Sequence, residues 1–244
     1  MVYNFAPNNW EVKLNCERWI NVTYSMENEW ITENLGTLSE GGVRTVTADE
    51  LCGVVPTNTL ALLSLTNNPI SRNSCSLPVL SGTLNTTPVW RATIGLSSAH
   101  TKTSYQGEID PFPQNGTLLS FGPFLQYGKD IENYLIFLNV ENSAATRTAE
   151  IEIYTANRLN LKGKFTVRNN SSNIIALNDL ELNKDDLLLV MCKKMAGIPL
   201  YFSRTIDGVY MSLEHSHPPA SFVVHGNRWE AQKLLKKNWF NKVG

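Results

Sequence analysis

The segment Ser212–Trp229, SLEHSHPPASFVVHGNRW, holds three of the four histidines of the chain. If residues 209–217 form a β-strand, His215 and His217 project from one face, because side chains alternate along a strand with a period of two. Two neutral imidazoles at this spacing are a common beginning of a Zn, Fe or Cu site. A third ligand and a carboxylate would come from four candidates: His225, Glu214, Glu108 and Asp110.

The competing interpretation of this segment is a solvated strand end. A His-x-His pair before two prolines can equally bond loop carbonyls, and Glu108 and Asp110 can be turn residues. The cupin pattern, which also places His-x-His on a strand, expects a glutamate a few residues later, but here PPASF follows. The resemblance to cupins therefore fails at a required ligand. The sequence favours a polar strand end and a protein without a cofactor. The alternative is a site that binds Zn or Fe.

Other catalytic chemistry is poorly represented. The chain has no G-x-S-x-G, no phosphate loop ending in Lys-Ser/Thr, no H-E-x-x-H and no dinucleotide fingerprint. His100, in SSAHTKTSYQGE, is a lone histidine in a Ser/Thr-rich stretch, which favours a solvated side chain. The absence of these catalytic motifs lowers the expectation that the protein is an enzyme, without excluding it.

Composition indicates a globular protein without a strongly charged partner. The 244 residues are 42% hydrophobic and 18% charged, and the net charge is -1. This balance provides no basic field for nucleic acid or an anionic membrane. The N-terminus lacks a basic segment followed by an apolar run, and no stretch has the length and apolarity of a membrane span. We expect a cytoplasmic protein, although a virion component or leaderless export would show the same pattern.

The cysteines and the Asn-x-Ser/Thr triplets carry little weight at this point. The cysteines are scattered and form no C-x-x-C pair, which favours reduced thiols over a disulfide framework: Cys16, Cys52, Cys75 and Cys192. Triplets that match a glycosylation acceptor begin at Asn21, Asn85, Asn115 and Asn169. They would matter only in a secretory pathway, and Asn-rich loops produce them by chance.

Short β-type runs separated by turn residues cover most of the chain and predict an all-β fold. The runs include WEVKLNC, WINVTY, VRTVT, LALLSL, VWRATIGL, NYLIFLNV, AEIEIYT, KFTVR, DLLLVMC and PLYFSR. In AEIEIYT, Ile151 and Ile153 fall on one face of the strand, and Glu150 and Glu152 fall on the other. Almost no helical periodicity occurs before residue 227.

A weak internal repeat suggests two similar β-sandwich-like units, residues 1–113 and 114–226. Five features recur in the same order, from WINVTY to SYQGEIDP in the first half and from NYLIFLNV to SLEHSHPP in the second. Laying Pro111 on Pro218 places Glu108 and Asp110 opposite His215 and His217. A pseudo-twofold axis between the units would then bring two carboxylates and two histidines together.

Two segments are expected to bury apolar surface. The junction PFPQNGTLLSFGPFLQYGKD carries Phe112, Phe121 and Phe124 and is too apolar for a free linker. Residues 227–244 hold a helix near 227–240, where Trp229, Leu234, Leu235 and Trp239 form an apolar stripe. Such a helix usually closes the end of its own sheet or docks onto a second subunit.

The function expected from these features is non-enzymatic binding or assembly, with self-association or another protein as the partner. Tryptophans and the Phe-rich junction supply anchors that interfaces favour, above all Trp229, Leu235, Trp239, Phe112, Phe121 and Phe124. The alternative is a small metal-dependent enzyme of cupin-like chemistry. It would use His215 and His217 as ligands, with Glu214 or Glu108 as the acid/base.

Overall fold

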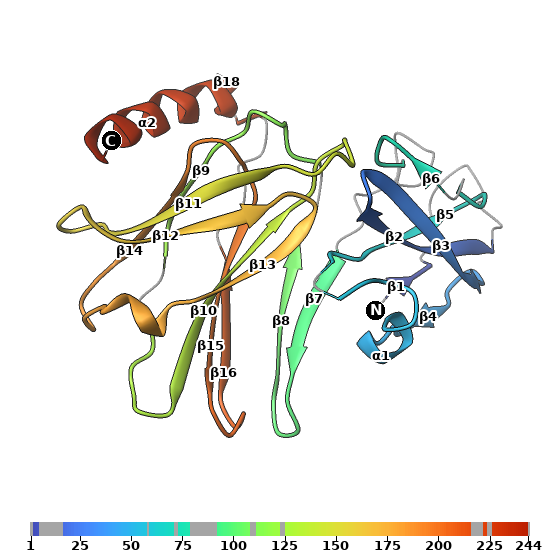
Figure 1. Cartoon of the computed structure of the whole chain (residues 1–244). Coiled ribbons are helices and arrows are strands. Elements are labelled where there is room, and N and C mark those ends of the chain that lie inside the picture. Colours follow the sequence, from blue (N-terminus) through green and yellow to red (C-terminus); the bar gives the residue numbers. More distant parts are fainter. Residues whose placement is uncertain are drawn as a thin grey trace.

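The computed structural model describes residues 2–4, 17–57, 59–70, 73–78, 92–107, 111–122, 125–215, 222–223 and 226–243. Most of the regular structure in these ranges is β-strand, with helices α1 (Ala48–Leu51) and α2 (Arg228–Val243) and a 3-10 turn, η1 (Asn178–Leu180). The expected all-β class and the C-terminal helix are confirmed. Figure 1 shows a sandwich of two sheets beside a smaller N-terminal sheet.

The sandwich contains eight strands in two antiparallel sheets of four. The strands are β9 (Leu118–Phe121), β10 (Ile131–Asn139), β11 (Thr148–Thr155), β12 (Asn160–Arg168), β13 (Ser171–Ala176), β14 (Leu188–Cys192), β15 (Ile198–Thr205) and β16 (Met211–His215). One sheet has the order β13-β10-β15-β16 and the other has the order β12-β11-β14-β9. The chain therefore crosses between sheets repeatedly, for example from β12 to β13.

The main core lies between these two sheets and follows from the alternation of side chains. Ile151 and Ile153 of β11 are fully buried there, whereas Glu150 on the opposite face is exposed. Leu135 and Phe137 of β10 belong to the same buried cluster from the other sheet. The period-two pattern of the sequence thus identifies the inward face correctly.

The N-terminal sheet has the order β5-β2-β3-β6. Its strands are β2 (Arg18–Met26), β3 (Glu29–Leu38), β5 (Leu62–Thr66) and β6 (Asn73–Ser74), and β1 (Val2–Tyr3) pairs with β4 (Val43–Arg44) nearby. Strand β2 is buried on both faces, with Ile20 and Val22 on one face and Asn21 and Thr23 on the other. The polar face is satisfied by side-chain hydrogen bonds, such as that from Asn21 Nδ2 to Thr66 Oγ1 at 2.8 Å.

A hairpin of β7 (Ala92–Ser97) and β8 (Lys102–Gly107) stands between the two parts. Strand β8 lies alongside β16, so the hairpin, a two-stranded sheet of its own, stands next to the edge of the β13-β10-β15-β16 sheet (Figure 1). The tip of this hairpin is joined to the tip of the β15–β16 hairpin, because Ser98 Oγ donates a hydrogen bond of 2.6 Å to Gly208 O.

Helix α2 covers the outer face of the β12-β11-β14-β9 sheet (Figure 1). Trp239 packs there edge-on against Phe121 at 5.2 Å between ring centroids, and Lys236 Nζ donates to Thr117 O at 2.8 Å. The predicted apolar stripe is wrong at Leu234, which is 68% exposed. Leu234 lies five residues before Trp239, about 140° away around the helix. Among the described side chains of α2, Trp239 packs as predicted, and Phe240 and Val243 pack beside it.

The loop that follows β10 attaches the N-terminal sheet to the sandwich. Leu77 N donates to Asn142 O at 2.6 Å, and Ala144 N donates to Cys75 O at 3.1 Å, so the loop pairs with the chain beyond β6 like an added strand. Trp30 Nε1 donates to Asn142 O at 3.0 Å. The Trp30 ring is buried in a cluster with Leu62, Val140 and Ala144. Both parts thus contribute side chains to one apolar cluster.

The expected internal repeat is not confirmed. Strand β2, which holds WINVTY, pairs directly with β5, whereas β10 and β14, at the corresponding places of the second half, lie in different sheets. The predicted strand WEVKLNC lies outside the described residues.

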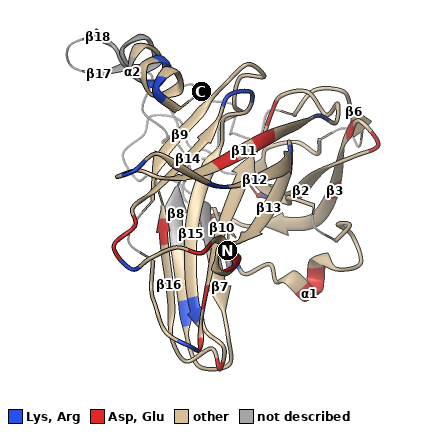
Figure 2. Ribbon diagram, turned by 60° about the vertical axis from the view of Figure 1, so that its left-hand side comes forward, with Lys and Arg blue, Asp and Glu red and all other residues tan. Residues whose placement is uncertain are grey.

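In the part of the chain that the structure describes, charges of both signs are distributed over the molecule. In Figure 2, Lys and Arg are interspersed with Asp and Glu, and most of the length of the sandwich strands is uncharged. This distribution agrees with the net charge of -1. Among the described residues, no helix has the length and apolarity needed to cross a membrane.

Candidate binding site

Two of the predicted metal ligands lie at the end of β16. His215 is half-buried and pairs with Leu200 of β15, and Glu214 is exposed and pairs with Tyr201. As adjacent residues of a strand, Glu214 and His215 point to opposite faces of the sheet. His215 therefore shares its face with Leu213 and Leu200, which is an apolar setting.

The remaining predicted ligands lie outside the described residues: His217, His225, Glu108 and Asp110. Within the part of the chain that the structure describes, no three His, Cys, Asp or Glu side chains come together in a way that could hold a metal ion. The metal site stays the alternative interpretation of His-x-His, beside the favoured polar strand end. His100 is exposed at the tip of the β7–β8 hairpin, as expected for a solvated histidine.

The predicted interface anchors are in part internal contacts of this chain. Phe112 packs with Leu60 on a buried cluster of the sandwich, which agrees with a junction that packs between the two parts. Phe121 of β9 contacts Trp239 of α2, so both rings lie in the contact between the helix and the sheet. The side chains of Trp229 and Leu235 and all of Phe124 lie outside what the structure describes.

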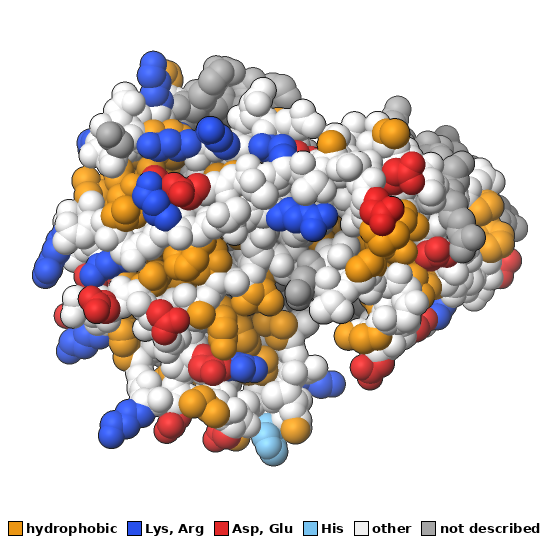
Figure 3. All heavy atoms as spheres, viewed as in Figure 1, with side chains coloured by type: hydrophobic (Ala, Val, Ile, Leu, Met, Phe, Trp, Pro, Cys, Tyr) orange, Lys and Arg blue, Asp and Glu red, His pale blue; other side chains and the backbone are white. Residues whose placement is uncertain are grey.

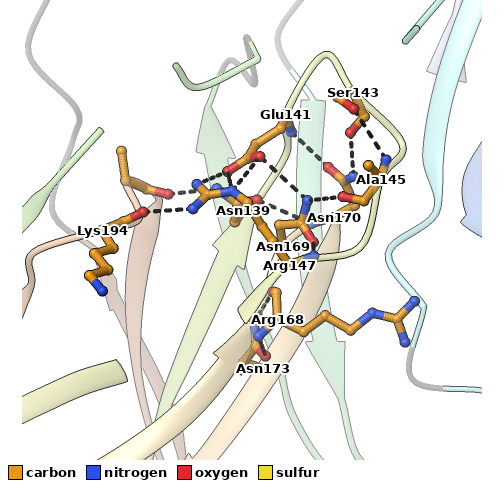
Figure 4. A network of polar contacts seen from close by, with 11 residues as sticks. Asn139, Glu141, Ser143, Ala145, Arg147, Arg168, Asn169, Asn170, Asn173 and Lys194 are labelled. Atoms are coloured by element: carbon orange, nitrogen blue, oxygen red, sulfur yellow. Dashed lines mark hydrogen bonds and ion pairs between the residues drawn. The ribbon is translucent and has the colours of Figure 1, made fainter. Parts of the chain in front are cut away.

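A buried ion pair organises the loop after β10 (Figure 4). The Glu141 side chain is fully buried, and its carboxylate accepts hydrogen bonds from Arg147 Nε at 2.8 and 3.0 Å. Arg147 Nη1 donates to Lys194 O at 2.8 Å, and Asn169 Oδ1 accepts from Arg147 N at 2.9 Å. The bonds to the Glu141 carboxylate raise the pKa of Arg147, so this cation stays charged.

The asparagines of the β12–β13 turn complete this network. Asn170 Oδ1 accepts from Glu141 N at 2.7 Å, and Asn170 Nδ2 donates to Ser143 O at 2.9 Å. Asn139 Oδ1 accepts from Asn170 N at 3.1 Å. Because these groups bond one another, the network shapes the loop on which the N-terminal sheet docks. It is a structural junction between the two parts of the molecule.

The turn between β15 and β16 presents several apolar side chains outward close together in the sequence. Its backbone is fixed from within, since Thr205 Oγ1 and Val209 N both donate to Asp207 Oδ1, at 2.5 and 3.0 Å. These bonds hold the pKa of Asp207 below its usual range, so the carboxylate that anchors the turn is charged at neutral pH. Gly208 has φ of 70°, a conformation that other residues adopt at a cost.

Three large apolar side chains project from this fixed turn. Ile206 is 65% exposed, Val209 is 59% exposed and Tyr210 is 41% exposed. Tyr127, also exposed, lies in the loop before β10, and Ile206 N donates to Asp130 O of that same loop at 2.8 Å. We call these four residues, Tyr127, Ile206, Val209 and Tyr210, the hairpin-end surface. Figure 3 shows apolar side chains gathered over the middle of the sandwich, and at its lower end apolar side chains lie scattered among charges of both signs.

A small cavity opens at the same end of the sandwich. It has a volume of about 160 Å³ and is lined by Leu125, Tyr127, Ile131, Asn133, Leu177 and Leu182, among others. The amide of Asn133 is used internally, since its Nδ2 donates to Gln126 O at 2.9 Å and its Oδ1 accepts from Ser203 Oγ at 2.7 Å. Sites for cofactors and drug-sized ligands are usually about 300–1,000 Å³. This cavity suits a single side chain of a partner better than a cofactor.

The sequence contains a signal for the hairpin-end surface that the analysis of motifs missed. Asp207-Gly208 between two β-type runs is a strong hairpin signal, and here large apolar residues flank it where polar ones are usual. The chain matches no known protein family, no curated protein and no solved structure.

Proposed function

We infer that this protein is a non-enzymatic binding and assembly protein that associates with a second copy of itself through the hairpin-end surface. The observation that carries this proposal is the fixed turn of β15–β16, which exposes Ile206, Val209 and Tyr210 together. Loops at the end of a β-sandwich are frequent binding elements, because a rigid scaffold positions them.

The chemistry of this surface supports binding at low entropic cost. The turn is held by its own hydrogen bonds, so little backbone order is lost on association. Tyrosine is among the residues that contribute most to binding energy at interfaces. A net charge of -1 produces little repulsion between two copies. In a twofold dimer the same turn would meet its own copy, which requires only one such surface per chain.

Sedimentation velocity over a range of protein concentrations tests the proposal. The wild-type chain is expected to shift from monomer to dimer as concentration rises. The double variant I206D/V209D should stay monomeric, because a twofold contact would bury like charges against each other. V43D is the matched control, since Val43 is 61% exposed but lies on β4. A wild-type chain that stays monomeric, or a double variant that dimerises as well, would contradict the proposal.

A further inference from the structure

We propose that N-glycosylation of the interior Asn-x-Ser/Thr triplets and this fold exclude each other, so that the chain does not become native in a compartment where the unfolded chain is N-glycosylated. The described residues contain four such triplets: Asn21-Val22-Thr23, Asn115-Gly116-Thr117, Asn169-Asn170-Ser171 and the overlapping Asn170-Ser171-Ser172. A glycan is bulky and hydrated, and acceptor asparagines of glycoproteins therefore lie on the surface. In this structure three of the four acceptor positions are interior.

Asn21 lies in the buried polar face of β2 and is 1% exposed. Its Nδ2 donates to Thr66 Oγ1 at 2.8 Å and to Trp19 O at 3.2 Å, so both amide hydrogens are used. Thr23, which completes the triplet, is fully buried, and its hydroxyl contacts that of Thr32 at 3.0 Å. A sugar on Asn21 Nδ2 would therefore require the β5-β2-β3 sheet to open.

Asn169 and Asn170 lie in the network around Glu141 and are 1% and 3% exposed. Asn169 Nδ2 donates to Ala145 O at 2.9 Å, and Asn170 Nδ2 donates to Ser143 O at 2.9 Å (Figure 4). Both amides thus support the loop on which the N-terminal sheet docks. A glycan on either one would remove a hydrogen bond of this loop and displace the side chains packed around it.

Asn115 provides a contrast within the same chain. It lies exposed in a turn closed by the hydrogen bond from Gly116 N to Pro113 O at 2.8 Å. A glycan at this position would extend into solvent and leave the fold intact. The structure therefore separates one permissive acceptor from three that the native fold cannot accommodate.

The chemistry of oligosaccharide transfer determines whether glycosylation precedes or follows folding. Transfer forms a bond between Asn Nδ2 and the anomeric carbon of an oligosaccharide, and it breaks the bond from that carbon to the diphosphate of a lipid carrier. One amide proton is released, and the lipid diphosphate leaves. The interior triplets are reachable only in the unfolded chain, so modification there precedes folding and then prevents it.

The test is to direct the full chain into the secretory pathway of a eukaryotic cell with an added signal peptide. It is made with and without an inhibitor of oligosaccharide-lipid synthesis, and a version without the signal peptide is the native reference. Glycopeptide mass spectrometry locates the glycans, and gel filtration with limited proteolysis measures native protein. We expect glycans at Asn21, Asn169 or Asn170, loss of native protein and its recovery with the inhibitor. N115Q should show the same loss.

Three results would overturn the proposal. The first is native protein that carries a glycan at Asn21, Asn169 or Asn170. The second is native protein in which these positions stay unmodified although the transferring enzyme is active. The third is a loss of native protein that the inhibitor does not restore, since folding would then fail for a reason other than glycosylation.

Discussion

At the scale of single residues, two places in this protein depart from the usual distribution of polar and apolar side chains. One place buries polar groups, and the other exposes apolar groups. Glu141 and its partners are interior and bond one another, whereas Ile206, Val209 and Tyr210 project into solvent from a fixed turn. Buried polar groups are tolerated when they are paired, and exposed apolar groups gathered together point to an interaction surface. The first set therefore serves the fold, and the second forms the surface that we propose for self-association.

The ion pair of Glu141 leads to a stability prediction. E141A leaves the Arg147 guanidinium, whose side chain is 27% exposed, without its carboxylate partner. We expect the free energy of unfolding to fall by about 3 kcal/mol, the lower end for a broken buried pair because Arg147 keeps some contact with water. E132A is the control, since the Glu132–Arg204 pair lies at the surface. Urea denaturation that gives equal midpoints for both variants would show that the network adds no stability.

His215, at the end of β16, and His217, two residues later in the sequence, lead to a prediction about metal. Because His215 lies on an apolar face and Glu214 on the opposite one, we expect no bound Zn, Fe or Cu in protein purified without a tag. H215A/H217A should lower the free energy of unfolding by about 1 kcal/mol or less. Elemental analysis of the wild-type protein and of the variant measures whether either one contains bound metal. Stoichiometric metal that disappears in the variant would support the metal-dependent enzyme instead.

At the scale of elements, local patterns could be predicted and pairing partners could not. Ile151 and Ile153 face the core as their alternation requires, and α2 begins close to the expected position. The repeat was inferred from the order of strands, but order does not determine which strands hydrogen-bond. Strand β10 pairs with β13 and β15, which follow it by dozens of residues. The hairpin-end surface was missed because exposure depends on the assembled fold.

Helix α2 leads to a prediction about its two sides. W239A removes a half-buried ring from the contact with Phe121, and we expect the free energy of unfolding to fall by about 2 kcal/mol. L234A on the exposed side of the same helix should change it by less than about 0.5 kcal/mol. Thermal or chemical denaturation compares the two variants. Equal effects would mean that α2 is not held by the face that carries Trp239.

At the scale of the whole molecule, the N-terminal sheet and the sandwich depend on shared contacts. Trp30 lies in one cluster with Val140 and Ala144, and Ser25 Oγ donates to Ala144 O at 3.3 Å. The β7–β8 hairpin, from the first half of the chain, lies beside β16 of the second half. Separation would therefore expose apolar surface on both sides.

Separate expression of residues 1–113 and 114–244 tests this dependence. We expect insoluble pieces, or pieces that fold only when they are mixed, because each would lose its part of the Trp30 cluster. Gel filtration and circular dichroism of each piece and of the mixture provide the measurement. Two soluble, folded and monomeric pieces would show that the contacts between the parts are not needed for folding.

The central claim is that the hairpin-end surface binds a second copy, and hydrogen exchange at low and high protein concentration tests it most directly. Raising the concentration should slow exchange of the backbone amides in residues 206–210 and 127–130, while the turn that connects β11 and β12 exchanges at the same rate. Binding protects amides at the contact and leaves distant ones unchanged. Exchange that is independent of concentration throughout, or protection confined to another surface, would contradict the account.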